Sequence, residues 1–164
     1  MPIPDAFDLW LLQYGSIALF ILLFLGVLVL PLPQNALVLL AGVFIAQGKL
    51  MILPAFLAIF VAVILALTLT YWIGRTAGSF LLEKYGFYLG VTLARLQRVH
   101  RWYERAGKWT LFFGYYLPIV RRLMGYAAGM GQLSFQQFAL FAYTGAFFWT
   151  LLLLAIGYGI GHQL

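Results

Sequence analysis

The chain has 164 residues, of which 65% are hydrophobic and only 9% are charged, whereas soluble domains average roughly 45–50% apolar and 25% charged residues. This composition excludes an ordinary soluble enzyme and predicts one integral membrane domain. The net charge of +6 does not indicate a nucleic-acid partner, because seven of the ten cations lie between two apolar segments, in residues 75–108, and the absence of cysteine excludes disulfides, thiolate metal sites and a cysteine nucleophile.

The first half of the chain begins with an interfacial N-terminal segment, residues 1–15, which lacks the basic start of a cleaved signal peptide. An apolar run then reaches Leu30, breaks at Pro31-Leu32-Pro33, and resumes until the polar turn that ends at Lys49. Residues 16–49 therefore form either one crossing followed by a buried helix, or a re-entrant hairpin that enters and leaves on the same face. Residues 51–74 are predicted to be a full transmembrane helix.

The segment 75–108 alternates apolar and basic residues at helical spacing. It is predicted to be an amphipathic helix on the cytoplasmic leaflet, because positive charge favours the cytoplasmic side. A plain solvated linker helix is the alternative interpretation.

The second half repeats the pattern of a broken segment followed by a full span. Residues 109–131 are interrupted by Pro118, and residues 135–161 form the last transmembrane helix. The predicted fold is an all-α integral membrane protein, an inverted repeat of two re-entrant helical hairpins and two full transmembrane helices with a cytoplasmic amphipathic connector helix. Both termini would then lie outside; four simple crossings are the alternative.

Several short motifs occur in one order along the chain, and together they resemble the DedA family, the bacterial branch of the SNARE-associated or VTT-domain proteins. They are Pro31-x-Pro33, Tyr71-Trp72-Ile73-Gly74-Arg75, Phe113-Gly114-x-x-Leu117-Pro118-x-x-Arg121, Ala128-Gly129-Met130 and Gly145-Ala146-x-x-Trp149. The resemblance implies facing re-entrant hairpins and the movement of lipids, such as undecaprenyl phosphate or phosphatidylethanolamine, between leaflets of the inner (plasma) membrane.

The chain departs from the family pattern at three polar positions. The family's glutamate aligns with Asn35, its aspartate with Leu67 and its first arginine with Tyr115, while its second arginine is kept as Arg121. The only acids are Asp5, Asp8, Glu83 and Glu104. None lies within a predicted span, so proton coupling through a buried carboxylate has no candidate residue, and passive or potential-driven movement is predicted.

The proposed lipid-phosphate site centres on Arg121, which the family motif assigns to the interior. A guanidinium binds phosphate oxygens bidentately, and the helix N-terminus after Pro118 adds amide donors. Arg122 points about 100° away on the same helix, and the alternative for both is that they extend to the headgroups. Further candidates for substrate binding, each with a structural alternative (helix capping, interfacial packing or extension to the surface), are Gln34, Asn35, Tyr115 and Arg75.

The predicted function is a flippase-like or scramblase-like translocase of lipid-phosphate headgroups, with membrane lipids as partners and no nucleic acid. No metal or cofactor is expected, since neither His100 nor His162 has a metal partner at suitable spacing. A lipid-phosphate-modifying enzyme is disfavoured because no nucleophile–base pair is present. A non-transporting assembly or membrane-homeostasis protein is the other alternative, and the oligomeric state, homo-oligomer included, stays open.

Overall fold

The computed structural model describes residues 6–28, 33–89, 94, 97–98, 101, 104–105, 107, 109–114 and 116–163. Within these residues all regular secondary structure is helical, which confirms the predicted all-α class. The helices are α1 (Ala6–Leu28), α2 (Gln34–Ala46), α3 (Ile52–Leu89), α5 (Trp109–Gly114), α6 (Pro118–Met130) and α7 (Phe135–Gln163).

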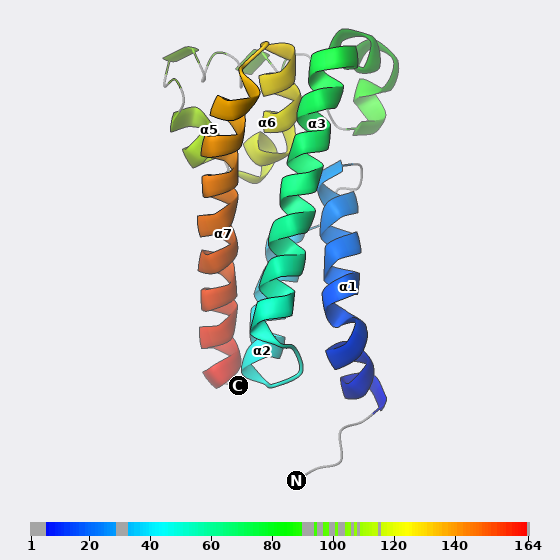
Figure 1. Ribbon diagram of the computed structural model, residues 1–164, viewed down its shortest axis with the longest axis vertical. Helices are drawn as coiled ribbons and strands as arrows, with labels where there is room; N and C mark the ends of the chain where they lie inside the picture. The colour runs from blue at the N-terminus through cyan, green and yellow to red at the C-terminus, as the bar shows by residue number, and fades with distance from the viewer. Residues whose placement is uncertain are drawn as a thin grey trace.

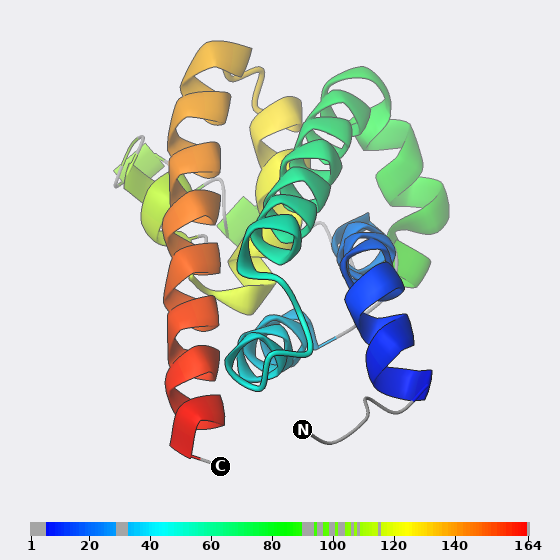
Figure 2. The same cartoon turned by 60° about the horizontal axis from the view of Figure 1, so that its bottom comes forward.

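The helices form an elongated bundle in which α3 and α7 are the long members (Figure 1). Helix α1 packs on α3, α2 packs mainly on α7, and α6 packs mainly on α3. Figure 2 shows α2 lying among α1, α3 and α7 when the lower end of the bundle is turned forward. The start of α1 and the end of α7 lie at the same end of the bundle (Figure 1).

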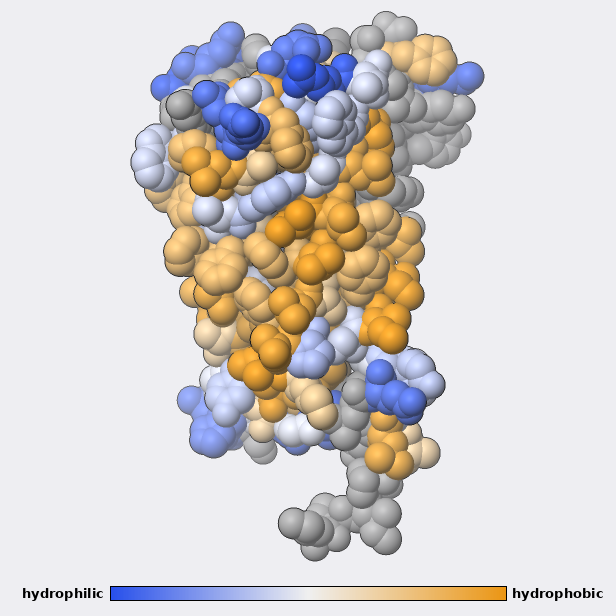
Figure 3. All heavy atoms as spheres, viewed as in Figure 1, coloured by the Kyte–Doolittle hydropathy of each residue, from blue (hydrophilic) through white to orange (hydrophobic). Residues whose placement is uncertain are grey.

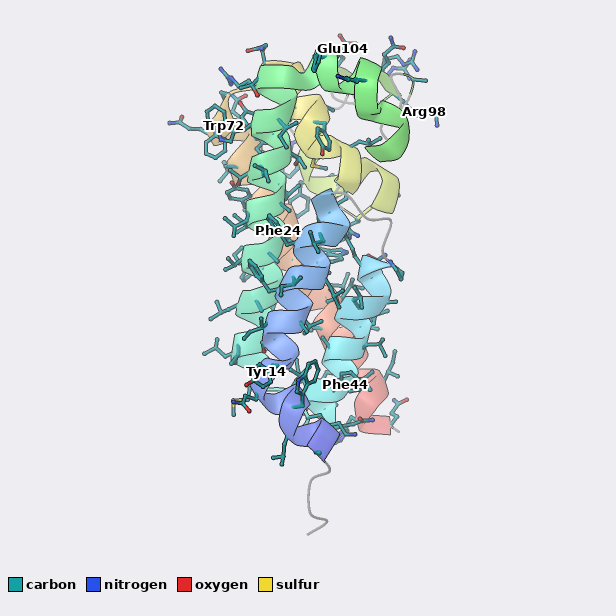
Figure 4. All side chains as sticks on the ribbon, turned by 90° about the vertical axis from the view of Figure 1, so that its right-hand side faces the viewer. Tyr14, Phe24, Phe44, Trp72, Arg98 and Glu104 are labelled. Carbon is teal, nitrogen blue, oxygen red and sulfur yellow. The ribbon has the colours of Figure 1, made fainter. Side chains whose placement is uncertain are left out.

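Among the described residues, two helical segments are long and apolar enough to cross a membrane, namely Ile52–Thr76 within α3 and Phe135–Gln163. Because a helix rises ~1.5 Å per residue, these segments exceed the ~30 Å thickness of the hydrocarbon core. On the face shown in Figure 3, apolar side chains cover the middle of the bundle and hydrophilic ones gather at both ends. Figure 4 places Trp72 toward one end and Tyr14 and Phe44 toward the other, as expected of aromatic residues at membrane interfaces.

Glycines bring the backbones of two helix pairs into direct contact. A Cβ atom on Gly42 of α2 would lie 2.6 Å from the Leu154 carbonyl oxygen of α7, and one on Gly74 of α3 would lie 2.5 Å from the Tyr126 carbonyl oxygen of α6. A Cβ atom cannot lie this close to a carbonyl oxygen, so any residue larger than glycine would force the two helices apart. These contacts fix α2 against α7 and α6 against α3, as small residues do in membrane proteins.

The helices of the structure continue past two predicted boundaries, although the candidate span Ile52–Thr76 agrees with the predicted transmembrane helix 51–74. The expected separate interfacial segment 1–15 is, from Ala6 onward, part of the continuous 23-residue helix α1. Helix α3 does not end at residue 74 but runs to Leu89, so the predicted connector 75–108 begins inside it. The pair Gly74-Arg75 resembled a helix end, yet Gly74 is a packing position against α6.

The remainder of the predicted connector is described only in part. Its described helical positions are exposed and include Arg98, Arg101, Glu104 and Arg105. Figure 4 places Arg98 and Glu104 at the same end of the bundle as Trp72. The apolar face expected for this connector falls on residues outside the described ones.

Candidate functional site

Arg121 lies in the first turn of α6, where the sequence makes a new helix begin. Pro118 is the first residue of α6 and has no backbone N–H to leave unsatisfied, which suits it to this position. The Arg121 N–H donates to the Leu117 carbonyl oxygen at 2.9 Å and closes the first turn. This placement buries the arginine side chain, of which only 5% is exposed.

The first two residues of α2 bind the Arg121 guanidinium. Nη2 donates to Oε1 of Gln34 at 2.8 Å, and Nη1 donates to Oδ1 of Asn35 at 3.1 Å. These amides follow Pro33, as Arg121 follows Pro118, and neither side chain caps α2. The structure thus brings Arg121, Gln34 and Asn35 to one place from two helix breaks far apart in the sequence.

An aromatic ring covers the face of the same guanidinium. The Arg121 Cζ lies 4.3 Å from the centroid of Trp149, which is buried on α7. A cation over the indole face is stabilised by the ring quadrupole, most strongly where water is excluded. Trp149 is not among the site residues predicted from the sequence; its only signal there is its place in the family motif Gly145-Ala146-x-x-Trp149.

The electrostatic character of the site follows from these partners. A guanidinium keeps its charge in proteins, and the Gln34 and Asn35 oxygens that accept from it belong to neutral carboxamides. Neutral acceptors satisfy N–H groups without cancelling the charge. Phosphate oxygens match the donor geometry of a guanidinium, so a phosphate is a ligand that this side chain could bind.

Arg75 is not part of this site. Its Nη1 donates to the Tyr71 hydroxyl at 2.6 Å and to the Leu133 carbonyl oxygen at 3.2 Å, and the Tyr71 hydroxyl donates to the same carbonyl at 2.5 Å. These bonds tie α3 to the loop between α6 and α7. In this structure Arg75 therefore holds helices together, and a headgroup contact stays a prediction.

The other predicted residues are placed as follows. Leu67, at the family's aspartate position, is buried on α3, where its carbonyl oxygen faces Gly125 of α6. Arg122 follows Arg121 on α6, but its side chain lies outside the described part of the structure. Tyr115 and the first structural break, Pro31, also fall outside it. Among the described residues, no group of three or more His, Asp or Glu side chains could hold a metal ion.

Comparison with known proteins places these features in a family. The VTT domain matches residues 32–159. The membrane protein YbfM of Bacillus subtilis is 34% identical, with 91% of this chain and 92% of that protein covered. Protein DedA of Escherichia coli is 31% identical over 87% of this chain and 67% of its own length.

A third relative, undecaprenyl phosphate transporter A of Bacillus subtilis, is 25% identical over 94% of this chain and 76% of its own length. No solved structure gives a significant match. The family match covers most of the chain and includes both helix breaks that meet at Arg121. The chain belongs to the VTT-domain (DedA) family of membrane proteins.

Proposed function

We propose that this protein is a lipid translocase that moves lipid-phosphate headgroups between membrane leaflets, with Arg121 as the phosphate-binding residue. The observation that carries the proposal is the buried Arg121 guanidinium, held by neutral Gln34 and Asn35 amides between two helix breaks. A cation inside an apolar bundle is expensive to bury, so its presence favours a functional role. An anionic headgroup is the ligand that such a site would bind.

The names of two relatives support the substrate class. Proteins called undecaprenyl phosphate transporter A, from Bacillus subtilis and Staphylococcus aureus, are 25% and 24% identical to this chain. Their name specifies a lipid phosphate. At these identities the relatives' particular lipid cannot be assigned to this chain. The proposal therefore names only the shared chemistry, a phosphate on a lipid, with undecaprenyl phosphate and phospholipids as candidates.

We further propose that the bundle is an inverted repeat in a cell membrane, with α1–α2 and α5–α6 as facing re-entrant hairpins. The packing supports this: α2 of the first half lies on α7 of the second, and α6 of the second half lies on α3 of the first. Helices α2 and α6 have 13 residues each, ~20 Å, too short to cross alone. The basic connector would face the cytoplasm.

Transport rather than catalysis fits the described chemistry. Thr70, Thr144 and Thr150 donate to carbonyl oxygens of their own helices, so none is paired with a base that would make it a nucleophile. We propose that the protein is not an enzyme. Turnover of a lipid phosphate by the purified protein would contradict this.

The proposal is tested by reconstitution into liposomes with labelled phosphatidylglycerol or a labelled polyprenyl phosphate. The protein should speed movement between leaflets, and Arg121→Ala should slow it to near the rate of empty liposomes. Arg98→Ala, which removes an exposed arginine of the connector, is the matched control and should transport normally. Equal rates in empty and protein-bearing liposomes would refute the proposed function.

A further inference from the structure

The glycine contacts divide the core of the bundle into two tightly packed helix pairs. In the first pair, Gly42 of α2 meets Gly157 of α7, and Gly161 of α7 meets the backbone of Val43. In the second pair, Gly125 and Gly129 of α6 lie against Thr70 and Tyr71 of α3. Backbones in such close contact cannot slide without a clash, so each pair is expected to move as one body.

Arg121 connects the two pairs. It belongs to α6, which packs on α3, but its side chain reaches Gln34 and Asn35 of α2 and Trp149 of α7, which form the other pair. Breaking the Arg121 hydrogen bonds would therefore free the starts of α2 and α6 from each other, while the Thr68–Tyr143 hydrogen bond and the stacked rings of Tyr71 and Phe138 keep α3 on α7.

A phosphate would compete with these amides. Both terminal nitrogens of the guanidinium already donate, Nη2 to Gln34 and Nη1 to Asn35, so a headgroup that binds this pair of nitrogens end-on takes the place of the amides. A bond to a phosphate pairs two ions, whereas the bonds to the amides are charged on the donor side alone, so the phosphate is the stronger acceptor for the guanidinium.

We propose that Gln34 and Asn35 are competitors of the lipid headgroup for Arg121, and that a bound headgroup releases the start of α6 from the start of α2. Trp149 is a positioning residue that keeps the guanidinium in place when the amides leave. The inference rests on the proposed function and assigns the two amides a gating role. If the amides instead bound the headgroup, removing them would weaken lipid binding. In the competition proposed here, removing them should strengthen it.

The first test is calorimetric titration of the purified protein in neutral detergent with dihexanoylphosphatidylglycerol, an anionic phosphodiester lipid. The near-isosteric double variant Gln34→Met/Asn35→Leu should bind it about 10-fold more tightly than the native chain, because one charged hydrogen bond no longer has to be broken. Gln47→Met, at the exposed end of α2, is the control and should leave the affinity unchanged. Unchanged or weaker binding by the double variant would overturn the competition.

Further measurements distinguish a lipid headgroup from free phosphate as the ligand, and they test the proposed function independently of the competition. Inorganic phosphate should bind far more weakly than the lipid; equal binding would overturn a lipid headgroup as the ligand. Trp149→Leu in the double-variant background should lower lipid affinity about 5-fold through loss of the cation–π contact, with partial recovery in Trp149→Phe; no loss would overturn the positioning role. If native protein and Arg121→Ala bind the lipid equally, the proposed function itself fails.

The second test leaves the amides intact and measures the separation of the two helix starts. Spin labels on cysteines at Ala36 (first turn of α2) and Leu117 (just before α6) report across them, and labels at Gln47 (just after α2) and Ile160 (α7) report within one pair. All four positions are exposed, and the chain has no native cysteine. Adding the lipid should lengthen the Ala36–Leu117 distance and leave the Gln47–Ile160 distance constant. An Ala36–Leu117 distance that stays constant with bound lipid would overturn the release.

Discussion

Arg121 donates a hydrogen bond of 2.8 Å to the side-chain oxygen of Gln34, a residue 87 positions earlier in the chain. Gln34 is the first residue of α2 and Arg121 lies in the first turn of α6, each of them after a proline, and both are buried. The contact joins the beginnings of α2 and α6, which lie far apart along the chain. Its existence depends on the way in which the two halves of the chain pack across each other.

Replacing Arg121 with lysine should separate the effect of charge from that of geometry. Arg121→Lys keeps a positive charge but loses the planar fork and much of the stacking on Trp149. The rate of phosphatidylglycerol movement in liposomes should therefore fall about 10-fold, a transition-state loss of ~1.4 kcal/mol, and stay above the rate of Arg121→Ala. A lysine variant as fast as the native protein would show that a point charge is sufficient.

The site could be predicted from the sequence where its residues obey local rules. Pro33 and Pro118 cannot continue a preceding helix, so the starts of α2 and α6, and with them Gln34, Asn35 and Arg121, could be located. The contact with Trp149 could not, since it depends on how α6 crosses α7. The same holds for α3: Gly74-Arg75 is a plausible helix end, and only the partner Tyr126 reveals a packing glycine.

The glycine contacts between α2 and α7 should be essential for stability. Gly157→Val would place a branched side chain against the backbone of Leu39 and Gly42, and overpacking of this kind should lower the free energy of unfolding by about 3 kcal/mol. Gly159→Val, two residues further on the same helix, is the matched control, because a Cβ there meets no atom within 4 Å. Thermal unfolding in detergent compares the two, and equal destabilisation would contradict the packing.

Arg75 should affect stability rather than anion binding. Arg75→Ala removes hydrogen bonds to Tyr71 and to the carbonyl oxygen of Leu133. Because the side chain is exposed, the expected loss of unfolding free energy is about 1 kcal/mol. Titration with dihexanoylphosphatidylglycerol should give the native affinity. A large drop in affinity with unchanged stability would instead place Arg75 in the headgroup site.

Lipid movement should respond to membrane potential and not to pH. The four acids of the chain are Asp5, Asp8, Glu83 and Glu104, none of them in the spanning segments Ile52–Thr76 and Phe135–Gln163, and Asn35 and Leu67 cannot titrate. With phosphatidylglycerol, whose phosphodiester keeps one negative charge near neutrality, the rate should stay within about 2-fold between about pH 6 and 8, where ordinary carboxyl groups remain ionised.

A potential set by a potassium gradient and valinomycin should, in contrast, redistribute the same lipid. A potential of ~100 mV contributes ~2.3 kcal/mol per charge, about a 50-fold bias toward the positive leaflet. Zwitterionic phosphatidylcholine carries no net charge and should show no bias, which makes it the control in the same liposomes. If a pH gradient moved phosphatidylglycerol and the potential did not, a proton would have to travel with the lipid. The chain would then need a titrating group at the Arg121 site that neither Asn35 nor Leu67 provides.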